Sequence, residues 1–600
     1  MDRTGLSPER TLRSGNTRIP EERNCKNVKY ILKYLKPYRG RVIIGSVIKF
    51  LGTIMDLVLP WILAHLIDDI VPLGQIGKVV LWGCVMVVVA LLGFVGNVAA
   101  NRMASAVARD AARRIRYDLF QKVLSLSGRQ IDDYTVPSLE SRLTSDTYHV
   151  HQLLGQMQRI GFRAPILLVG GLIVTALFEP VLTLVIVALL PFITWIVFRV
   201  SLKGIPMYAD VQRSNDRMVG VVRENVQGIR VIKALSKKES EKKRFRRVNR
   251  ELGAKEMTAG ITMGVTNPLM TFFLNLGMTG VIIVGAFRVS YGLTDPGKII
   301  AFLSYFTIIL NAMLSVSRVF VMYSKGTASA NRIGEILDAP EDLVLAEDAE
   351  PGRGLPSHIS FENVSFSYRE GKTQLSDISF SVGKGESLGI IGATGSGKST
   401  VIKLLERFYD ADSGRIALNG RDVRSIPRDE LYAMFGSVMQ NDVIFEDTVA
   451  ENIRFGRQLD DETVRKAAAL AQASEFIERF EEGYEHPLTS RGTNISGGQK
   501  QRILIARALA GNPDILILDD SSSALDYKTD AELRASLRAL EKRPTTILVA
   551  QRVSSLADCD KILVLEKGRI AGYGTAEELN DTCPIFREIR ETQMGGMIVD

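Results

Sequence analysis

Long apolar runs alternate with long basic stretches over the first 320 residues of this 600-residue chain. Crossing the hydrocarbon core of a bilayer takes about 20 apolar residues in a helix. Six segments meet this requirement, at residues 42–67, 79–101, 160–178, 181–198, 257–287 and 299–317. A soluble helical core is an alternative for any one segment but not for six, because soluble helices keep a polar face. The pattern therefore predicts six membrane-spanning helices.

The connections between these segments differ in length and charge. Stretches 102–159 and 199–256 are long and rich in Lys and Arg, whereas the others are short and nearly balanced. The positive-inside rule therefore places both long stretches in the cytoplasm, and an even number of spans places both termini there. Each long stretch favours two helices joined by a turn. The turns, near 132–139 and 229–235, are positioned to press on another domain, with ordinary helical hairpins as the alternative.

The first span carries two charges, Lys49 and Asp56. They lie two helical turns apart, too far along the helix to pair with each other. Charges inside spans usually face a cavity or a partner helix, so Asp56 is a candidate for a substrate cavity. Lys49 is nearer the cytoplasmic end, where snorkelling is the alternative. Five aromatic residues either line a pocket or, as we expect, pack helices: Phe272, Phe273, Phe302, Tyr305 and Phe306.

The C-terminal half alternates in the manner of a soluble α/β domain, with strands expected at 359–368, 375–382 and 386–391. The third strand leads into a glycine-rich loop and then a helix, which is the setting of a phosphate-binding loop. Its residues are Gly392, Ala393, Thr394, Gly395, Ser396, Gly397, Lys398, Ser399 and Thr400. Lys398 is expected to reach the β- and γ-phosphates and Ser399 to ligate Mg²⁺. The apolar run 515–519 ends in Asp519, which suits a strand that holds Mg²⁺ through water.

A second anion-binding device lies between these motifs. Ser496, Gly497, Gly498 and Gln499 stand at the start of a long helix, where backbone N–H groups and the helix dipole favour a phosphate. Because one domain carries two phosphate-binding motifs, we expect the second motif to bind the phosphate of a neighbouring chain's ATP site.

These motifs resemble those of the ATP-binding cassette (ABC) family, and residues 28–590 resemble its exporter-type half-transporters. The resemblance implies an all-α six-helix transmembrane domain followed by an α/β P-loop NTPase domain. It gives a tail at 1–27, a membrane domain at 28–325, a linker at 326–357, a cassette at 358–590 and a tail at 591–600. It also implies that Tyr368 stacks on adenine, that Gln440 contacts Mg²⁺ and senses the membrane half, and that Asp526 ends the D-loop.

Two departures from the family pattern concern ATP hydrolysis. Asp520 stands where the family has the Glu that polarises the attacking water, and Gln551 stands where it has His. Asp is one methylene shorter, and Gln cannot carry positive charge. Ser490, where the family usually has Glu, points the same way more weakly. We therefore expect a degenerate site that binds ATP and Mg²⁺ but hydrolyses poorly, and whose intact signature completes the site of a second, non-identical half-transporter.

The remaining composition narrows the functional classes. The net charge of +8 follows the loops between spans, which indicates membrane topology rather than nucleic acid. Four scattered cysteines give neither a metal site nor a disulfide framework. Six spans exclude a soluble ATPase. The expectation is a multi-pass protein of the plasma or inner membrane that exports an amphipathic drug, lipid or peptide. An importer, for example of a metal chelate, a homodimeric exporter with slow ATPase activity, and an ATP-gated channel or regulatory subunit remain alternatives.

Overall fold

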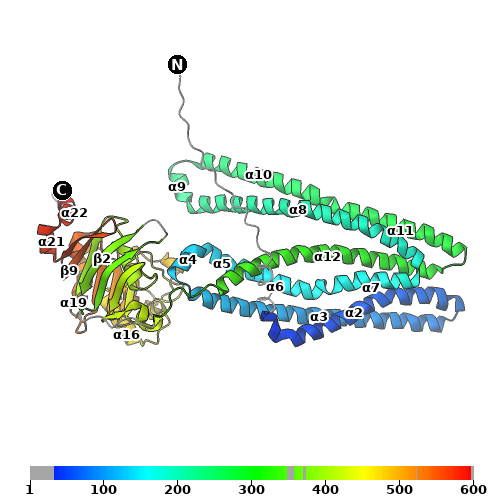
Figure 1. Cartoon of the computed structure of the whole chain (residues 1–600), viewed down its shortest axis with the longest axis horizontal. Helices are drawn as coiled ribbons and strands as arrows, with labels where there is room; N and C mark the ends of the chain where they lie inside the picture. The colour runs from blue at the N-terminus through cyan, green and yellow to red at the C-terminus, as the bar shows by residue number, and fades with distance from the viewer. Residues whose placement is uncertain (1–32, 347–356, 369–372, 522, 596–600) are drawn as a thin grey trace, which may run out of the picture. The chain divides into compact units, whose positions relative to one another are not determined.

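The chain divides into two compact units, a membrane unit and a cassette unit (Figure 1). The computed structural model describes residues 33–346, 357–368, 373–521 and 523–595. The membrane unit comprises Met1–Leu124 and Pro137–Ala339, and the cassette unit comprises Ser125–Val136 and Pro340–Asp600. The expected tail at 1–27 lies outside the described residues.

The described membrane unit is helical throughout. Its helices are α2 (Arg39–His65), α3 (Ile76–Leu124), α5 (Val136–Ser141), α6 (Thr147–Gln156), α7 (Arg163–Phe178), α8 (Pro180–Gln227), α9 (Ile229–Ala234), α10 (Lys238–Gly264), α11 (Thr266–Ser290) and α12 (Pro296–Leu337). A π-helical turn, Arg142–Asp146, joins α5 to α6. α8 packs along α10 and α11, while α2 packs on α3 and α12 packs on α7 (Figure 1).

Six helical stretches of the described chain are long and apolar enough to cross a membrane. They are Lys33–Leu73, Ile76–Leu124, Val136–Phe178, Pro180–Gln227, Lys238–Ser290 and Pro296–Val316. Several greatly exceed the 30 Å of a hydrocarbon core: the 49 residues of α3 measure roughly 70 Å. The predicted six-helix membrane domain is confirmed, and so are two helical extensions that continue beyond the apolar spans.

Two expected boundaries differ from the structure. α12 continues to Leu337, so the boundary drawn at residue 325 falls inside a helix, and residues 326–337 are not a linker. The apolar span ends near Val316, but helix-forming residues such as Ala328 and Ala330 prolong the helix. The turn of the first long stretch also contains its own helix, α4 (Gly128–Tyr134), which belongs to the cassette unit.

The described part of the cassette unit carries ten strands in two sheets. They are β1 (Ile359–Phe366), β2 (Leu375–Val382), β3 (Ser387–Gly392), β4 (Ser413–Leu418), β5 (Arg421–Asp422), β6 (Phe435–Val438), β7 (Ile515–Asp519), β8 (Thr545–Val549), β9 (Lys561–Glu566) and β10 (Arg569–Gly574). The antiparallel sheet has the order β2-β1-β4-β5, and the larger sheet has the order β10-β9-β3-β8-β7-β6. Strands β9, β3, β8, β7 and β6 are parallel, so the carboxyl ends of β3 and β7 reach one edge, where ligands bind in such sheets.

The helices of the cassette unit, besides α4, surround the larger sheet and the loops at its edge. They are α13 (Lys398–Leu405), α14 (Arg428–Ala433), α15 (Val449–Arg454), α16 (Asp461–Leu470), α17 (Ser474–Ile477), α18 (Gly497–Leu509), α19 (Tyr527–Arg538), α20 (Val553–Leu556), α21 (Ala576–Thr582) and α22 (Pro584–Gly595). α22 reaches into the expected C-terminal tail at 591–600, of which residues 591–595 are helical.

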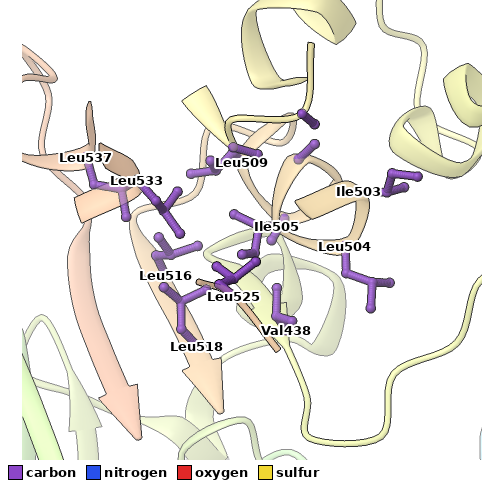
Figure 2. Packing of buried hydrophobic residues seen from close by; sticks show 14 of the residues in the cluster. Val438, Ile503, Leu504, Ile505, Leu509, Leu516, Leu518, Leu525, Leu533 and Leu537 are labelled. Carbon is purple, nitrogen blue, oxygen red and sulfur yellow. The ribbon is translucent and has the colours of Figure 1, made fainter. Parts of the chain in front are cut away.

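A buried apolar cluster ties α18 to the sheet. Figure 2 shows Ile505 and Leu509 of α18 beside Leu516 and Leu518 of β7, with Val438 of β6 close by. All five side chains are at least 91% buried, so the helix that follows the second anion-binding motif is rigidly attached to the strand that ends in Asp519. Burying such side chains contributes about 1.5–3 kcal/mol each.

Candidate functional site

The phosphate-binding loop closes over the end of β3 because glycine allows two close approaches. A Cβ on Gly392 would lie 2.1 Å from the Leu565 carbonyl oxygen, so the loop packs against β9 only without a side chain. Gly397 has a φ of 106°, a left-handed conformation that L-residues rarely adopt, immediately before α13 begins. The strand–loop–helix setting expected from the sequence is present, and it turns the N-terminus of α13 toward the loop.

Lys398 folds back over this loop. Its Nζ donates hydrogen bonds to the carbonyl oxygens of Gly392 at 2.8 Å and Ala393 at 3.0 Å. Burial lowers the pKa of Lys398, while the neighbouring carboxylates of Asp519 and Asp520 act in the opposite direction. The ammonium group is thus held beside the loop and faces two acidic side chains.

Asp519 ends β7 with only 4% of its surface exposed, and it is hydrogen-bonded to Ser399. Burial raises the pKa of Asp519, and the hydrogen bond to Ser399 opposes that rise. A buried carboxylate beside a hydroxyl is the pair that a magnesium ion on a nucleotide would need. The sequence placed these two residues on the same ion, and the structure brings them together.

The loop and these acids line a cavity of about 170 Å³. Eight of its lining residues were expected from the sequence: Thr394, Gly395, Gly397, Lys398, Ser399, Thr400, Gln440 and Asp519. Ser396 Oγ is buried and has no hydrogen-bond partner among the described residues, an unfilled polar position inside the loop. A nucleotide phosphate with Mg²⁺ fits this cavity. The glycine-rich loop leaves room for the phosphate, and an ammonium group, a carboxylate and an unpartnered hydroxyl surround it. The nucleotide would supply the phosphoanhydride bond, and Mg²⁺ would offset the negative charge of the phosphates.

Asp520 and Gln551 also line this cavity, and they bond to each other. Gln551 Nε2 donates to Asp520 Oδ2 at 3.0 Å, and Gln440 Nε2 is 3.5 Å from the same oxygen. The backbone N–H of Asp520 donates to Val549 at 2.9 Å, and its φ of 53° turns the residue out of the strand. The acidic side chain is therefore fixed between two neutral amides.

Gln374 is a lining residue that the sequence reasoning missed. It lies just before β2, and its Nε2 is 3.4 Å from the Gly395 carbonyl oxygen. No motif marks this position, because its place in the cavity depends on how β2 passes the loop. Val549 and Ala550, at the end of β8, complete the lining for the same reason.

Tyr368 lies apart from the lining of this cavity. Its hydroxyl is 3.2 Å from Thr400 Oγ1, and its ring meets Phe366 and Tyr409 edge-on. Stacking of this ring on adenine therefore stays a prediction. The contact with Thr400 nevertheless puts the aromatic side chain against the helix that carries the phosphate loop.

The second anion-binding motif is exposed at the N-terminus of α18. Ser496 and Gln499 form a capping box in which the Ser496 hydroxyl accepts from the Gln499 N–H at 3.3 Å and Gln499 Oε1 accepts from the Ser496 N–H at 2.9 Å. None of the four residues 496–499 belongs to the described lining of the phosphate cavity of the same chain. Asp526 caps α19 in a similar way, with its carboxylate accepting from the Thr529 N–H at 2.9 Å.

The helix α4 lies in a socket of the cassette unit. The Gly128 N–H donates to the Phe408 carbonyl at 3.1 Å, Tyr409 Oη donates to Asp132 Oδ2 at 2.7 Å, and Arg428 donates to the Ser125 carbonyl at 3.0 Å. A Cβ on Gly128 would lie 2.8 Å from the Tyr409 ring, so this residue permits the close approach. The same Tyr409 ring contacts Tyr368, which links α4 to the helix of the phosphate loop.

The charged residues of the first span have separate partners in the membrane unit. Asp56 lines a cavity of about 480 Å³ and accepts from Arg163, while Lys49 is buried and donates to Asn101 at 3.0 Å. Lys49 therefore turns toward α3. Phe302, Tyr305 and Phe306 are buried in helix packing, as expected, and Phe273 packs partly against the same cluster. Phe272 differs from the expectation, because it is 59% exposed.

Comparisons with known proteins agree with both halves of this description. Residues 42–313 match the model of the ABC transporter transmembrane region, and residues 375–523 match the model described as ABC transporter. The uncharacterized ABC transporter ATP-binding protein YfiB of Bacillus subtilis is 33% identical over 94% of this chain and 98% of its own length. A multidrug resistance ABC transporter ATP-binding and permease protein of Lactococcus lactis is 29% identical over 95% of this chain and 96% of its own. The structure of a bacterial Atm1-family ABC exporter with ATP bound superposes with a TM-score of 0.79 at 26% identity, covering 92% of this chain and 98% of that one.

Proposed function

The chain belongs to the ABC transporter family, with a transmembrane region fused to an ATPase domain, and on that premise we propose that it is the degenerate-site subunit of a heterodimeric exporter. It would act in the plasma or inner membrane, with both termini and the ATPase domain in the cytoplasm. The substrate would be a small amphipathic molecule. The likeness to an Atm1-family exporter and to a multidrug resistance transporter supports the direction of transport.

The observation that carries the proposal is the Asp520–Gln551 hydrogen bond of 3.0 Å inside the phosphate cavity. A catalytic carboxylate must reach the water beside the γ-phosphate, and a misplacement of about 1 Å can cost about 100-fold in rate. Asp520 lacks one methylene of that reach and is engaged by amide donors. Gln551 can donate a hydrogen bond to developing charge but cannot supply a positive one.

The binding residues of the same cavity are complete, which supports retention of ATP without rapid turnover. Lys398, Ser399 and Asp519 would hold the phosphates and Mg²⁺, and Gln440 would report their presence. ATP bound there would keep two cassettes together. Tyr368 would stack on the adenine after leaving its contact with Tyr409.

The exposed signature supports the partner subunit. Residues 496–499 form the exposed N-terminus of α18, and the buried cluster attaches this helix rigidly to β7. Among the described residues, they do not line the phosphate cavity of their own chain. They would complete a second ATP site on a chain that keeps Glu and His. The exposed apolar residues Ile229, Val231 and Leu235 at α9 would press on the cassette of that partner. Closure of the cassettes would then move α4 and α9 and switch the membrane cavity between its two faces.

The experiment is steady-state ATPase activity of the purified chain, alone and with the product of a neighbouring half-transporter gene. We expect activity only in the mixed dimer, lost when the partner's catalytic Glu is replaced by Gln and kept in Asp520→Asn. Normal turnover by this chain alone, abolished by Asp520→Asn, would mean that Asp520 is a working catalytic carboxylate and the protein a homodimer. Uptake by inside-out vesicles supports export, and uptake by right-side-out vesicles contradicts it.

A further inference from the structure

The cavity of about 480 Å³ in the membrane unit carries an excess of positive charge. It lies between α2, α3, α7 and α12 and the turn that precedes α7. Lys49, Arg159 and Arg163 line it together with a single described acid, Asp56. Charged side chains gathered among membrane-spanning helices normally mark a ligand or ion pathway.

The negative charge of Asp56 is already satisfied. Arg163 donates to Asp56 Oδ2 at 3.0 Å, and Asn97 lies 3.3 Å from the same oxygen. Arg163 is still 45% exposed, so part of its guanidinium group remains directed at the open cavity. The one acid is thus paired by one of the three cations, which leaves two positive charges on the wall.

Lys49 and Arg159 are the two cations that Asp56 does not offset. Lys49 has 3% of its surface exposed and donates to the neutral amide oxygen of Asn101 at 3.0 Å. Arg159 donates through Nε to the Gly155 carbonyl at 3.1 Å, and no ion pair of Arg159 occurs within the described ranges. The outer nitrogens of that guanidinium group are donors in a fixed fork, suited to a carboxylate, sulfonate or phosphate.

The rest of the wall mixes apolar side chains with four neutral polar ones, Asn101, Gln156, Asn311 and Ser315. Leu167 of α7 and Ile308 and Ala312 of α12 face the cationic side across the cavity. A second, more open hollow shares Asn101 and continues along α3 past Arg102 and Arg109, extending the basic lining away from the cavity. The two unpaired cations suit an anionic head, and Leu167, Ile308 and Ala312 suit the apolar part of an amphipathic ligand.

We propose that this cavity binds an amphipathic organic anion, with Arg159 and Lys49 on the acidic head and α12 against the apolar body. The inference rests on the proposed transport function, because it names the substrate class of that same protein. The anionic group belongs either to a free amphiphile or to a lipid headgroup, since both present the same chemistry to the cations.

The test uses the dimer that the ATPase experiment identifies, assembled from full-length chains in nanodiscs. It compares the binding of two fluorescent probes to this dimer. 8-Anilinonaphthalene-1-sulfonate and N-phenyl-1-naphthylamine share one ring skeleton, and only the first carries a sulfonate. Arg159→Gln should weaken the sulfonate probe roughly ten- to hundredfold and leave the neutral probe unchanged. Arg159→Lys keeps the charge but loses the planar fork, so it should weaken the sulfonate probe less than Arg159→Gln does. Arg113→Gln, which changes an exposed cation of α3 outside the cavity, should have no effect.

Unchanged sulfonate affinity in Arg159→Gln, or equal losses of both probes, would overturn the proposal. Adding phosphatidylglycerol to phosphatidylcholine nanodiscs identifies the occupant. Competition with the sulfonate probe in the unmodified protein but not in Arg159→Gln indicates a lipid headgroup, and no competition indicates a free amphiphile. Probe binding does not depend on which subunit hydrolyses ATP, so a failed heterodimer proposal and a failed anion site give different results.

Discussion

The exchange of Asp520 for Glu, made together with Gln551→His, restores the two side chains that the family places beside the γ-phosphate. The background is the mixed dimer whose partner site has been inactivated by Glu→Gln, so that any hydrolysis arises at the phosphate cavity of this chain. If the cavity is otherwise complete, the double variant should regain ATPase activity. Lys398→Ala in the same background removes the phosphate-binding amine and provides the inactive control.

The expected gain follows from the geometry of the cavity. One added methylene extends the carboxylate by about 1.5 Å, the length of a C–C bond. Asp520 Oδ2 now lies 3.0 Å from Gln551 Nε2, so the double variant removes this hydrogen bond and leaves the longer carboxylate free to reach further into the cavity. A shift of about 1 Å is worth about 100-fold in rate, and a donor on developing charge contributes a further roughly 100-fold. Because such residues act as a unit, we expect at least about 100-fold in total and not the full product.

The assay is phosphate release at saturating ATP, with nucleotide binding measured in parallel. A rate in the double variant that stays within about threefold of the background, with ATP binding intact, would refute the reasoning that Asp520 and Gln551 limit hydrolysis. Asp520→Glu alone separates reach from charge: most of the gain should appear in that single variant, because the carboxylate touches the attacking water.

Three further outcomes test packing and electrostatics. Gly128→Ala places a Cβ 2.8 Å from the nearest cassette atom and should weaken α4 docking by about 1–3 kcal/mol, raising hydrogen exchange over 125–136, whereas Gly253→Ala, with open space around it, should not. Burial raises the pKa of Glu406 to about 7, so the contribution of this group to cassette stability is greatest below about pH 4.5 and falls by roughly 3 kcal/mol as pH rises through 7. Calorimetry of Glu406→Gln should lack this part of the pH dependence. Arg332→Ala removes the guanidinium that bonds Asp146 at 2.8 Å and leaves a carboxylate only 2% exposed; the membrane unit should lose about 2–3 kcal/mol, read from the fluorescence of the three tryptophans, all in that unit.

The phosphate loop and the membrane-spanning helices could be predicted from short stretches of neighbouring residues. Gly392 to Thr400 needs only a strand, a turn and a helix in sequence order, and apolar length alone marks a membrane helix. Both expectations are confirmed because neighbouring residues decide them.

Side-chain contacts between segments far apart in the sequence could not be predicted in this way. No pattern in the sequence indicated that Tyr409 bonds Asp132 or that Arg163 pairs with Asp56. Which side chain meets which depends on helix rotation and crossing, and these are set by the packing of the whole bundle. The hydrogen bond between Asp520 and Gln551 is of the same kind, because two substitutions at the ends of different strands meet only once the sheet is assembled.

The capture of α4 by the cassette unit has a consequence for biogenesis. Residues 125–136 leave the ribosome well before Pro340, where the rest of that unit begins, and translation of the intervening chain takes roughly 10–40 s. During this interval α4 has no socket, and the α2–α3 and α5–α7 helices must insert with their connection exposed. The cassette, when it emerges, has to accept a segment from an earlier part of the chain before its surface around Phe408 and Tyr409 is covered. Completion of the ATPase domain is therefore also the step that covers α4, and a chain truncated before residue 340 would leave α4 available to holdase chaperones and proteases.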